Sequence, residues 1–276
     1  MKVRHISKKV KGIATSDGAG VSLTRVIGQP ALPRLDPFLM LDFFGSDKPN
    51  EYLAGFPAHP HRGFQTVTYM LDGKMRHKDS VGNEGVIEPG GIQWMNAGKG
   101  IIHEEMPEQE DGLLRGFQLW VNLPACDKMS APNYQDIKPH DVEVFKNDNM
   151  TVRILAGSYE GHVGPVKTDA VDSTFFDVHL STQGTVFSHQ LAIHNTAFVY
   201  VYQGSIDNGG ERLASGELGV FSEGESLVAT ANEACRFIVV AGKPLNEPVA
   251  QYGPFVMNTE QEIMEAIKDY QAGVLI

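Results

Sequence analysis

Short runs of apolar and β-branched residues, each ended by a turn signal, recur along the chain. The clearest runs lie at residues 66–71, 117–121, 198–202 and 237–240. Each ends in turn-forming residues, such as Asp72 and Gly73 after the first run. Strands of this length between frequent glycine turns are typical of β-sandwiches and β-barrels. The pattern therefore predicts an all-β fold.

One segment near the C-terminus has helical periodicity instead. Thr259 and Glu262 have the spacing of a capping box, in which each side chain satisfies a backbone donor of the first turn. One helical face then carries apolar side chains, namely Ile263, Met264, Ile267 and Tyr270. Gly273 is a suitable stop. We predict a short C-terminal α-helix that packs on the fold.

The apolar pattern also repeats. Residues 67–73 resemble 199–204, and residues 117–124 resemble 237–244. The repeat predicts two β domains of similar type, at residues 1–135 and 136–276. The polar, proline-containing stretch 127–148 is expected to carry the linker or an exchanged strand.

Composition and charge narrow the classes of function. The 276 residues include 34 acidic and 23 basic side chains, for a formal net charge of −11. This balance argues against direct nucleic-acid binding. We find no apolar stretch of about 18 residues that could span a membrane and no secretory signal. Two cysteines cannot form a disulfide framework, so we expect a cytoplasmic protein.

Two short motifs concentrate metal-ligand side chains. His59 and His61 form an H-x-H pair, and His103 and Glu105 have the same spacing. Residues i and i+2 of a strand share a face, so each pair can act together, and Glu104 should point away from that face. If the segments lie side by side, three imidazoles and one carboxylate converge. That set suits Fe2+, Mn, Zn, Ni, Cu or Co.

The remaining histidines have no such partners and are expected to be structural. They are His5, His77, His140, His162, His179, His189 and His194.

Longer motifs around these pairs resemble the signature of the pirin family within the cupin superfamily. They include the segments 59–64, 66–73 and 89–98, and also 103–107, 117–124 and 241–248. The resemblance extends from about residue 20 to residue 275. It implies a bicupin: two cupin-type β-barrels, the N-terminal one holding a single metal ion, Fe2+, through His59, His61, His103 and Glu105. The general cupin pattern has a glutamate shortly after its H-x-H, where this chain has Gln65.

The second half lacks these ligands. Aligning Gly85 with Gly216 places His59, His61, His103 and Glu105 on Gln190, Ala192, Ala234 and Arg236. Aligning the later motifs instead places the last two on Glu223 and Glu225. Neither alignment yields an H-x-H with a partner. We therefore expect a metal-free C-terminal barrel.

The resemblance implies quercetin 2,3-dioxygenase activity, the O2-dependent opening of a flavonol ring. Its substrates would be a small aromatic molecule and O2, with Glu105 as a candidate base for the flavonol proton. Gln118 is expected to contact substrate or a metal ligand. Arg62 could hold a carboxylate or pair locally. Pocket wall and barrel core are both open roles for Phe56, Phe64, Trp94 and Met106.

Pirins are also described as regulators. In that alternative the chain would bind a partner protein, its iron would bias a nearby surface, and catalysis would be slight or absent. We expect a monomer in either case.

Overall fold

The computed structural model describes residues 2–168 and 170–276. By its contacts the chain divides into two compact units, and each draws on separate parts of the sequence. The N-terminal barrel comprises Ile13–Pro139 and Leu245–Ile276; the C-terminal barrel comprises Met1–Gly12 and His140–Pro244. Within the described residues, no helix is long and apolar enough to cross a membrane.

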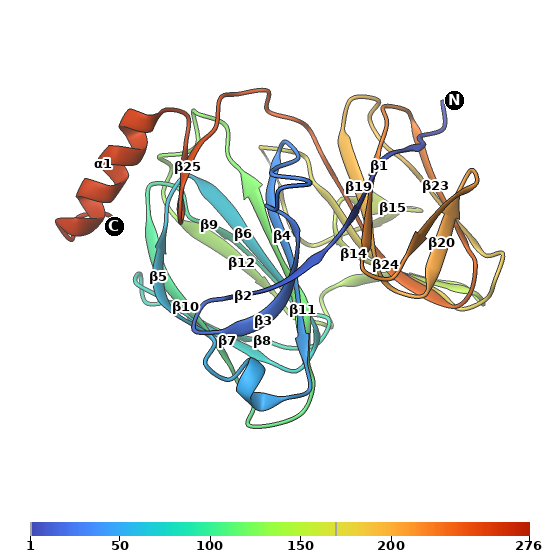
Figure 1. Cartoon of the computed structure of the whole chain (residues 1–276), viewed down its shortest axis with the longest axis horizontal. Helices are drawn as coiled ribbons and strands as arrows, with labels where there is room; N and C mark the ends of the chain where they lie inside the picture. The colour runs from blue at the N-terminus through green and yellow to red at the C-terminus, as the bar shows by residue number, and fades with distance from the viewer. Residues whose placement is uncertain (1, 169) are drawn as a thin grey trace. The chain divides into compact units, whose positions relative to one another are not determined.

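The N-terminal barrel is built from two antiparallel sheets (Figure 1). The larger sheet has the order β12 (Asn133–Ile137), β9 (Ile92–Asn96), β6 (Phe64–Asp72), β11 (Leu114–Asn122), β4 (Phe38–Ser46), β3 (Val21–Ile27) and β2 (Ile13–Asp17). The smaller sheet has the order β5 (Phe56–His61), β10 (Ile101–Pro107), β7 (Met75–Asp79) and β8 (Glu84–Ile87). A 3-10 turn, η1 (Pro49–Glu51), precedes β5.

The C-terminal barrel repeats this construction. Its larger sheet has the order β1 (Ile6–Lys11), β22 (Glu217–Phe221), β19 (Thr196–Gln203), β24 (Cys235–Gly242), β17 (Thr174–Leu180), β14 (Met150–Ala156) and β13 (Glu143–Lys146). Its smaller sheet has the order β18 (Val186–Gln190), β23 (Ser226–Ala231), β20 (Ser205–Asn208) and β21 (Glu211–Ala214). A further pair is β15 (Ser158–Tyr159) with β16 (His162–Val163).

The all-β prediction is confirmed, and the four predicted runs lie in β6, β11, β19 and β24. Most residues of each of these strands are buried, which suits their β-branched and aromatic side chains. In the C-terminal barrel, for example, Val199, Val201, Phe237 and Val239 belong to one buried apolar cluster. The repeat seen in the sequence thus corresponds to the same two strands, β6 with β19 and β11 with β24, at the same places in the two sheets.

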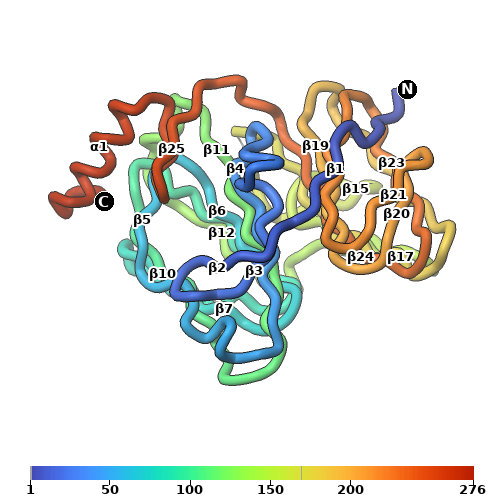
Figure 2. Tube along the Cα trace, in the orientation of Figure 1, coloured from blue at the N-terminus to red at the C-terminus, as the bar shows by residue number. Residues whose placement is uncertain are grey.

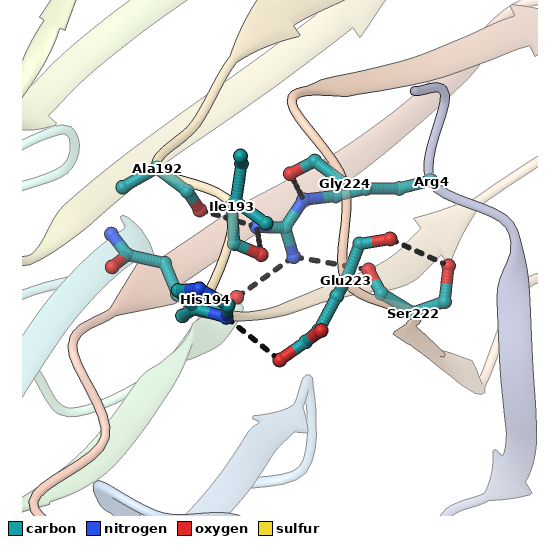
Figure 3. A network of polar contacts seen from close by, with 8 residues as sticks. Arg4, Ala192, Ile193, His194, Ser222, Glu223 and Gly224 are labelled. Carbon is teal, nitrogen blue, oxygen red and sulfur yellow. Dashed lines mark hydrogen bonds and ion pairs between the residues drawn. The ribbon is translucent and has the colours of Figure 1, made fainter. Parts of the chain in front are cut away.

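The first strand of the chain belongs to the C-terminal barrel. β1 pairs antiparallel with β22, and Figure 2 shows this blue segment beside the orange strands of that barrel. The fully buried Arg4 anchors the segment. Its guanidinium donates to the carbonyl oxygens of residues 192, 193, 195, 222 and 224 at 2.7–3.2 Å (Figure 3). All of its N–H groups are thus directed at backbone acceptors.

The last segment of the chain belongs to the N-terminal barrel. It contains β25 (Ala250–Tyr252), β26 (Phe255–Met257) and α1 (Glu260–Gln271). A buried ammonium, Lys128 Nζ, joins it to the barrel by donating to the carbonyl oxygens of Val256 at 3.0 Å and Gly63 at 2.7 Å. The two barrels therefore each hold one end of the chain through a buried cation.

The predicted helix is present, but two of the four side chains predicted to pack on the fold are exposed. Thr259 caps α1, and both reciprocal bonds of the capping box with Glu262 are formed. Ile263 is buried, whereas Met264 is 65% exposed and Tyr270 is 44% exposed. The contact face of the helix consists of Ile263, Ala266 and the partly buried Ile267, and is therefore narrower than predicted.

The predicted boundary between residues 135 and 136 stays a prediction. The chain passes between these units at Pro139 and His140.

Candidate metal centre

The two metal-ligand motifs lie on adjacent strands of the N-terminal barrel. β5 carries His59 and His61, and β10 carries His103 and Glu105. The strands pair antiparallel with His103 directly opposite His59, as Figure 1 shows for the two elements. Because i and i+2 share a strand face, this register brings three imidazoles to one side of the smaller sheet. The predicted juxtaposition of the two motifs is present.

The three rings form a compact cluster. Ring centroids are 4.7 Å apart for His59 and His61, 4.4 Å for His59 and His103, and 4.8 Å for His61 and His103. One nitrogen from each ring can be chosen so that all three lie within 4.8 Å of one another. Donor atoms at this spacing can reach a common ion.

Two of the histidines are held in the neutral form. Burial, together with neighbouring imidazoles, holds the pKa of His61 and of His103 well below its usual value. Both side chains are almost fully buried. A neutral imidazole has a lone pair to offer, which is the state that metal binding requires.

His59 has a fixed tautomer. Its Nδ1 lies 2.8 Å from the carbonyl oxygen of Pro57, which can only accept, so Nδ1 carries the proton. Its Nε2 lone pair then faces His61 Nε2 at 3.0 Å. Backbone carbonyls commonly fix metal-binding histidines in this way.

A buried nitrogen without a hydrogen-bond partner indicates whether the residues of the cluster suit a metal ion. His103 Nε2 is buried and has no hydrogen-bond partner among the described residues. Leaving a buried nitrogen unsatisfied costs free energy. A bound cation would accept the lone pair of His103 Nε2 and remove this cost. The chemistry of the three imidazoles therefore fits a transition-metal ion.

Glu105 is buried beside the cluster. Its carboxylate oxygens are not among the ligand atoms that lie within 4.8 Å of one another, which come from the three histidines. Thr68 Oγ1 donates to Glu105 Oε1 at 2.6 Å, and Gln118 Nε2 donates to Glu105 Oε2 at 2.6 Å. The carboxylate is thus oriented by two short hydrogen bonds. Glu104 is half-buried and lies 3.4 Å from Arg76, in an ion pair.

A cavity of about 780 Å³ opens against the cluster. His59, His61, Gln118 and Phe56 line it, as does Trp120, whose ring lies 5.3 Å from that of His61. The other lining residues are Asp17, Gly18, Arg25, Gly28, Pro33, Arg34, Leu39, Met40, Pro57, Gln251, Gly253 and Pro254. Two of the three imidazoles are therefore in contact with a space that can hold a small molecule.

Other residues singled out in the sequence are not part of the cavity lining. Arg62 pairs locally: it donates to the carbonyl oxygen of Lys99 and to Asp269 Oδ2, the latter at 2.8 Å. Phe64 is fully buried in a cluster with Leu39. Trp94 and Met106 do not line the cavity either. The Trp94 indole donates to Gln65 Oε1 at 3.1 Å, and Met106 is half-buried.

Sequence reasoning missed three further residues at the site. Thr68 lies opposite Gln118 in the β6–β11 register, which places both beside Glu105. Strand alternation could have found Thr68, because it is a buried polar residue within an apolar run. Trp120 and the buried His77 gave no local signal, since their positions depend on how distant strands pair.

These features define a class: a double-barrel protein with a candidate metal centre, a cluster of three histidines, in one barrel. Comparison with known proteins agrees. The pirin profile matches residues 20–121, and the profile of the pirin C-terminal cupin domain matches residues 175–276. The chain belongs to the pirin family, and both barrels are cupin domains.

Individual relatives cover the whole chain. A pirin-like protein of Caulobacter vibrioides is 51% identical over 99% of both chains. The crystal structure of a quercetin 2,3-dioxygenase from Acinetobacter baumannii has a TM-score of 0.92 at 34% identity, covering 99% of each chain. A bacterial pirin from Escherichia coli, solved in complex with nickel(II), shares the fold at 17% identity and a TM-score of 0.68, over 86% of this chain and 98% of that one.

Proposed function

We propose that this chain is a metal-dependent dioxygenase that opens the ring of a flavonol such as quercetin with O2. The observation that supports it is the convergence of three imidazoles at the wall of a cavity of about 780 Å³. Cavities of roughly 300–1,000 Å³ accommodate small-molecule ligands. The likeness to the Acinetobacter baumannii dioxygenase supports the same reaction class.

The proposed ligands are His59, His61, His103 and Glu105, and the proposed ion is Fe2+. Each carboxylate oxygen has two lone pairs, so Glu105 can contribute one while it accepts from Thr68 and Gln118. The donor set also suits Mn, Ni, Cu, Zn and Co. When bound, the ion supplies Lewis-acid chemistry that lowers the pKa of a hydroxyl group beside it.

In this proposal Glu105 also takes the flavonol proton. Gln118 and Thr68 hold its carboxylate, and the Gln118 side chain itself lines the cavity. Phe56 and Trp120 offer apolar surface to an aromatic substrate. These side chains orient the substrate hydroxyl toward the carboxylate and keep water from the reacting atoms.

Flavonol turnover tests the proposal. Protein loaded with Fe2+ and mixed with quercetin in air should bleach the flavonol absorbance, and His61→Ala should abolish this while its circular dichroism stays unchanged. Glu105→Gln should lower kcat by about 10²-fold or more, the scale of a lost general base. Glu104→Gln is the matched control, because its carboxylate pairs with Arg76 instead.

Absence of turnover across several metals and flavonols would overturn the enzymatic proposal. The regulatory alternative, with a protein partner, would then be the stronger one. A monomeric state and a cytoplasmic location stay predictions.

A further inference from the structure

A fourth histidine lies behind the cluster. His77, on β7, is fully buried and sits opposite Glu105 in the β7–β10 register. Its Nδ1 is 3.3 Å from His103 Nδ1, and the two ring centroids are 5.1 Å apart. Its position in the chain, away from both short motifs, gave no reason to connect it with them.

The contact between the two Nδ1 atoms fixes where the protons must be. His103 Nε2 is buried without a partner among the described residues, so it is the nitrogen that can face an ion. A ligating Nε2 carries no proton, which places the proton of neutral His103 on Nδ1. That Nδ1–H can be donated only if His77 Nδ1 offers its lone pair, and His77 must then be protonated on Nε2.

An aspartate and a tyrosine lie near His77. Its Nε2 lies 3.9 Å from Asp79 Oδ2, so the carboxylate is near the nitrogen that is expected to carry the proton. Asp79 is fixed in turn by the backbone N–H groups of Val81 and Asn83, both at 2.9 Å. The ring of Tyr134 lies 5.6 Å from that of His77.

We propose that His77 is a positioning residue of the metal centre, which accepts the Nδ1–H of His103 and so fixes the tautomer that presents His103 Nε2 to the ion. An acceptor behind a metal-binding histidine orients its ring and increases its basicity. The inference rests on the metal site of the proposed function but not on its substrate.

Imidazole 15N shifts of the Zn2+-loaded protein test the proton positions directly. The expected spectrum shows His103 protonated on Nδ1 and His77 protonated on Nε2. A spectrum with His77 protonated on Nδ1 would overturn the inference, since that proton would have to be donated toward His103.

Zn2+ affinity, measured by competition with a chromophoric chelator, tests the consequence. We expect His77→Phe to raise the Zn2+ Kd by about 10–100-fold, the usual effect of losing such a partner. His77→Asn should stay within about threefold of the wild type, because its amide oxygen lies near the lost Nδ1 and still accepts. His189→Phe, at a half-buried histidine of the other barrel, is the matched control and should bind as the wild type does.

The melting temperature of the metal-free variants separates positioning from folding. His77→Phe keeps a ring of similar size and removes two nitrogens, of which Nε2 has no hydrogen-bond partner among the described residues and Nδ1 contacts His103 Nδ1 at 3.3 Å, so the metal-free fold should be retained. Equal Zn2+ affinity of His77→Phe and wild type would overturn the inference and leave the proposed function intact. So would equally weak binding by His77→Asn and His77→Phe. A wild-type protein that binds no divalent ion would overturn both.

Discussion

The two barrels share one sheet order and differ in the side chains of two equivalent strands. By position in the smaller sheet, β5 corresponds to β18 and β10 corresponds to β23. β5 and β10 carry the three clustered imidazoles. β18 and β23 carry Phe187, Leu227 and Ala229, which are fully buried in the apolar core.

The described residues of the C-terminal barrel form its interior without a histidine cluster. Phe187 stacks on Tyr159 with ring centroids 5.3 Å apart, in the region where the other barrel has imidazoles and a cavity. One histidine, His189, borders this core, 4.9 Å from the ring of Phe176. A few side chains on two strands, rather than the fold, therefore separate a candidate metal centre from an ordinary core.

Removal of one imidazole from the cluster should have the largest effect, because it should weaken metal binding at the N-terminal barrel, the property that is proposed to distinguish the two barrels. His61→Ala is expected to weaken Zn2+ binding by on the order of 10²–10³-fold, since a ligand set shares a binding free energy of roughly 10–16 kcal/mol. The measurement is chelator competition. His189→Ala is the matched change in the C-terminal barrel, and an equal loss there would contradict the assignment of the site to the N-terminal barrel.

The buried cation of the C-terminal barrel should matter next. Arg4→Met leaves several buried carbonyl oxygens without a donor, and each such group costs about 1–3 kcal/mol. We expect a loss of about 3 kcal/mol in the free energy of unfolding of that barrel, measured by urea denaturation. Metal affinity should be unchanged, and a matching loss of Zn2+ binding would show that the barrels do not act separately.

His189 predicts a pH dependence for the stability of the C-terminal barrel. Burial lowers the pKa of His189 to about 4, below its usual value of about 6.5. Its neutral form is favoured in the folded state, so stability is fully present above pH 6.5 and is lost as pH falls toward 4. The expected loss is about 2 kcal/mol after allowance for partial exposure, by urea denaturation across that range. His189→Leu should flatten this part of the profile; an unchanged profile would place its origin elsewhere.

The smallest effect is expected at the helix that completes the N-terminal barrel. Thr259→Ala removes the hydroxyl that accepts from Glu262 N and should cost about 1 kcal/mol. Amide hydrogen exchange would show faster exchange in the first turn of α1. Protection in β18 and β23 should stay the same, and a change there would argue against a local capping effect.

Local patterns were sufficient for the strands, the capping box and the two metal-ligand motifs, whereas the convergence of these motifs was implied only by the family resemblance. They failed where the answer depends on long-range pairing. The exchange of terminal segments puts β1 in the C-terminal barrel and β25, β26 and α1 in the N-terminal one, and no periodicity encodes this choice.

The alignments of the repeat were also imprecise. They placed His103 on Ala234 or Glu223, whereas the strand equivalent to β10 is β23, Ser226–Ala231. The loops that connect equivalent strands differ in length between the two barrels. An alignment based on one glycine therefore cannot place every pair of equivalent strands correctly. His77 and Thr68 escaped notice for a related reason: each reaches the site across a strand pairing that local sequence does not reveal.

Anomalous scattering at the metal edge, from crystals of Fe2+-loaded protein, tests the central claim most directly. The account predicts one strong peak per chain, between the imidazole nitrogens of His59, His61 and His103 and beside the Glu105 carboxylate. A peak of comparable height in the C-terminal barrel, or none at the three imidazoles, would contradict it.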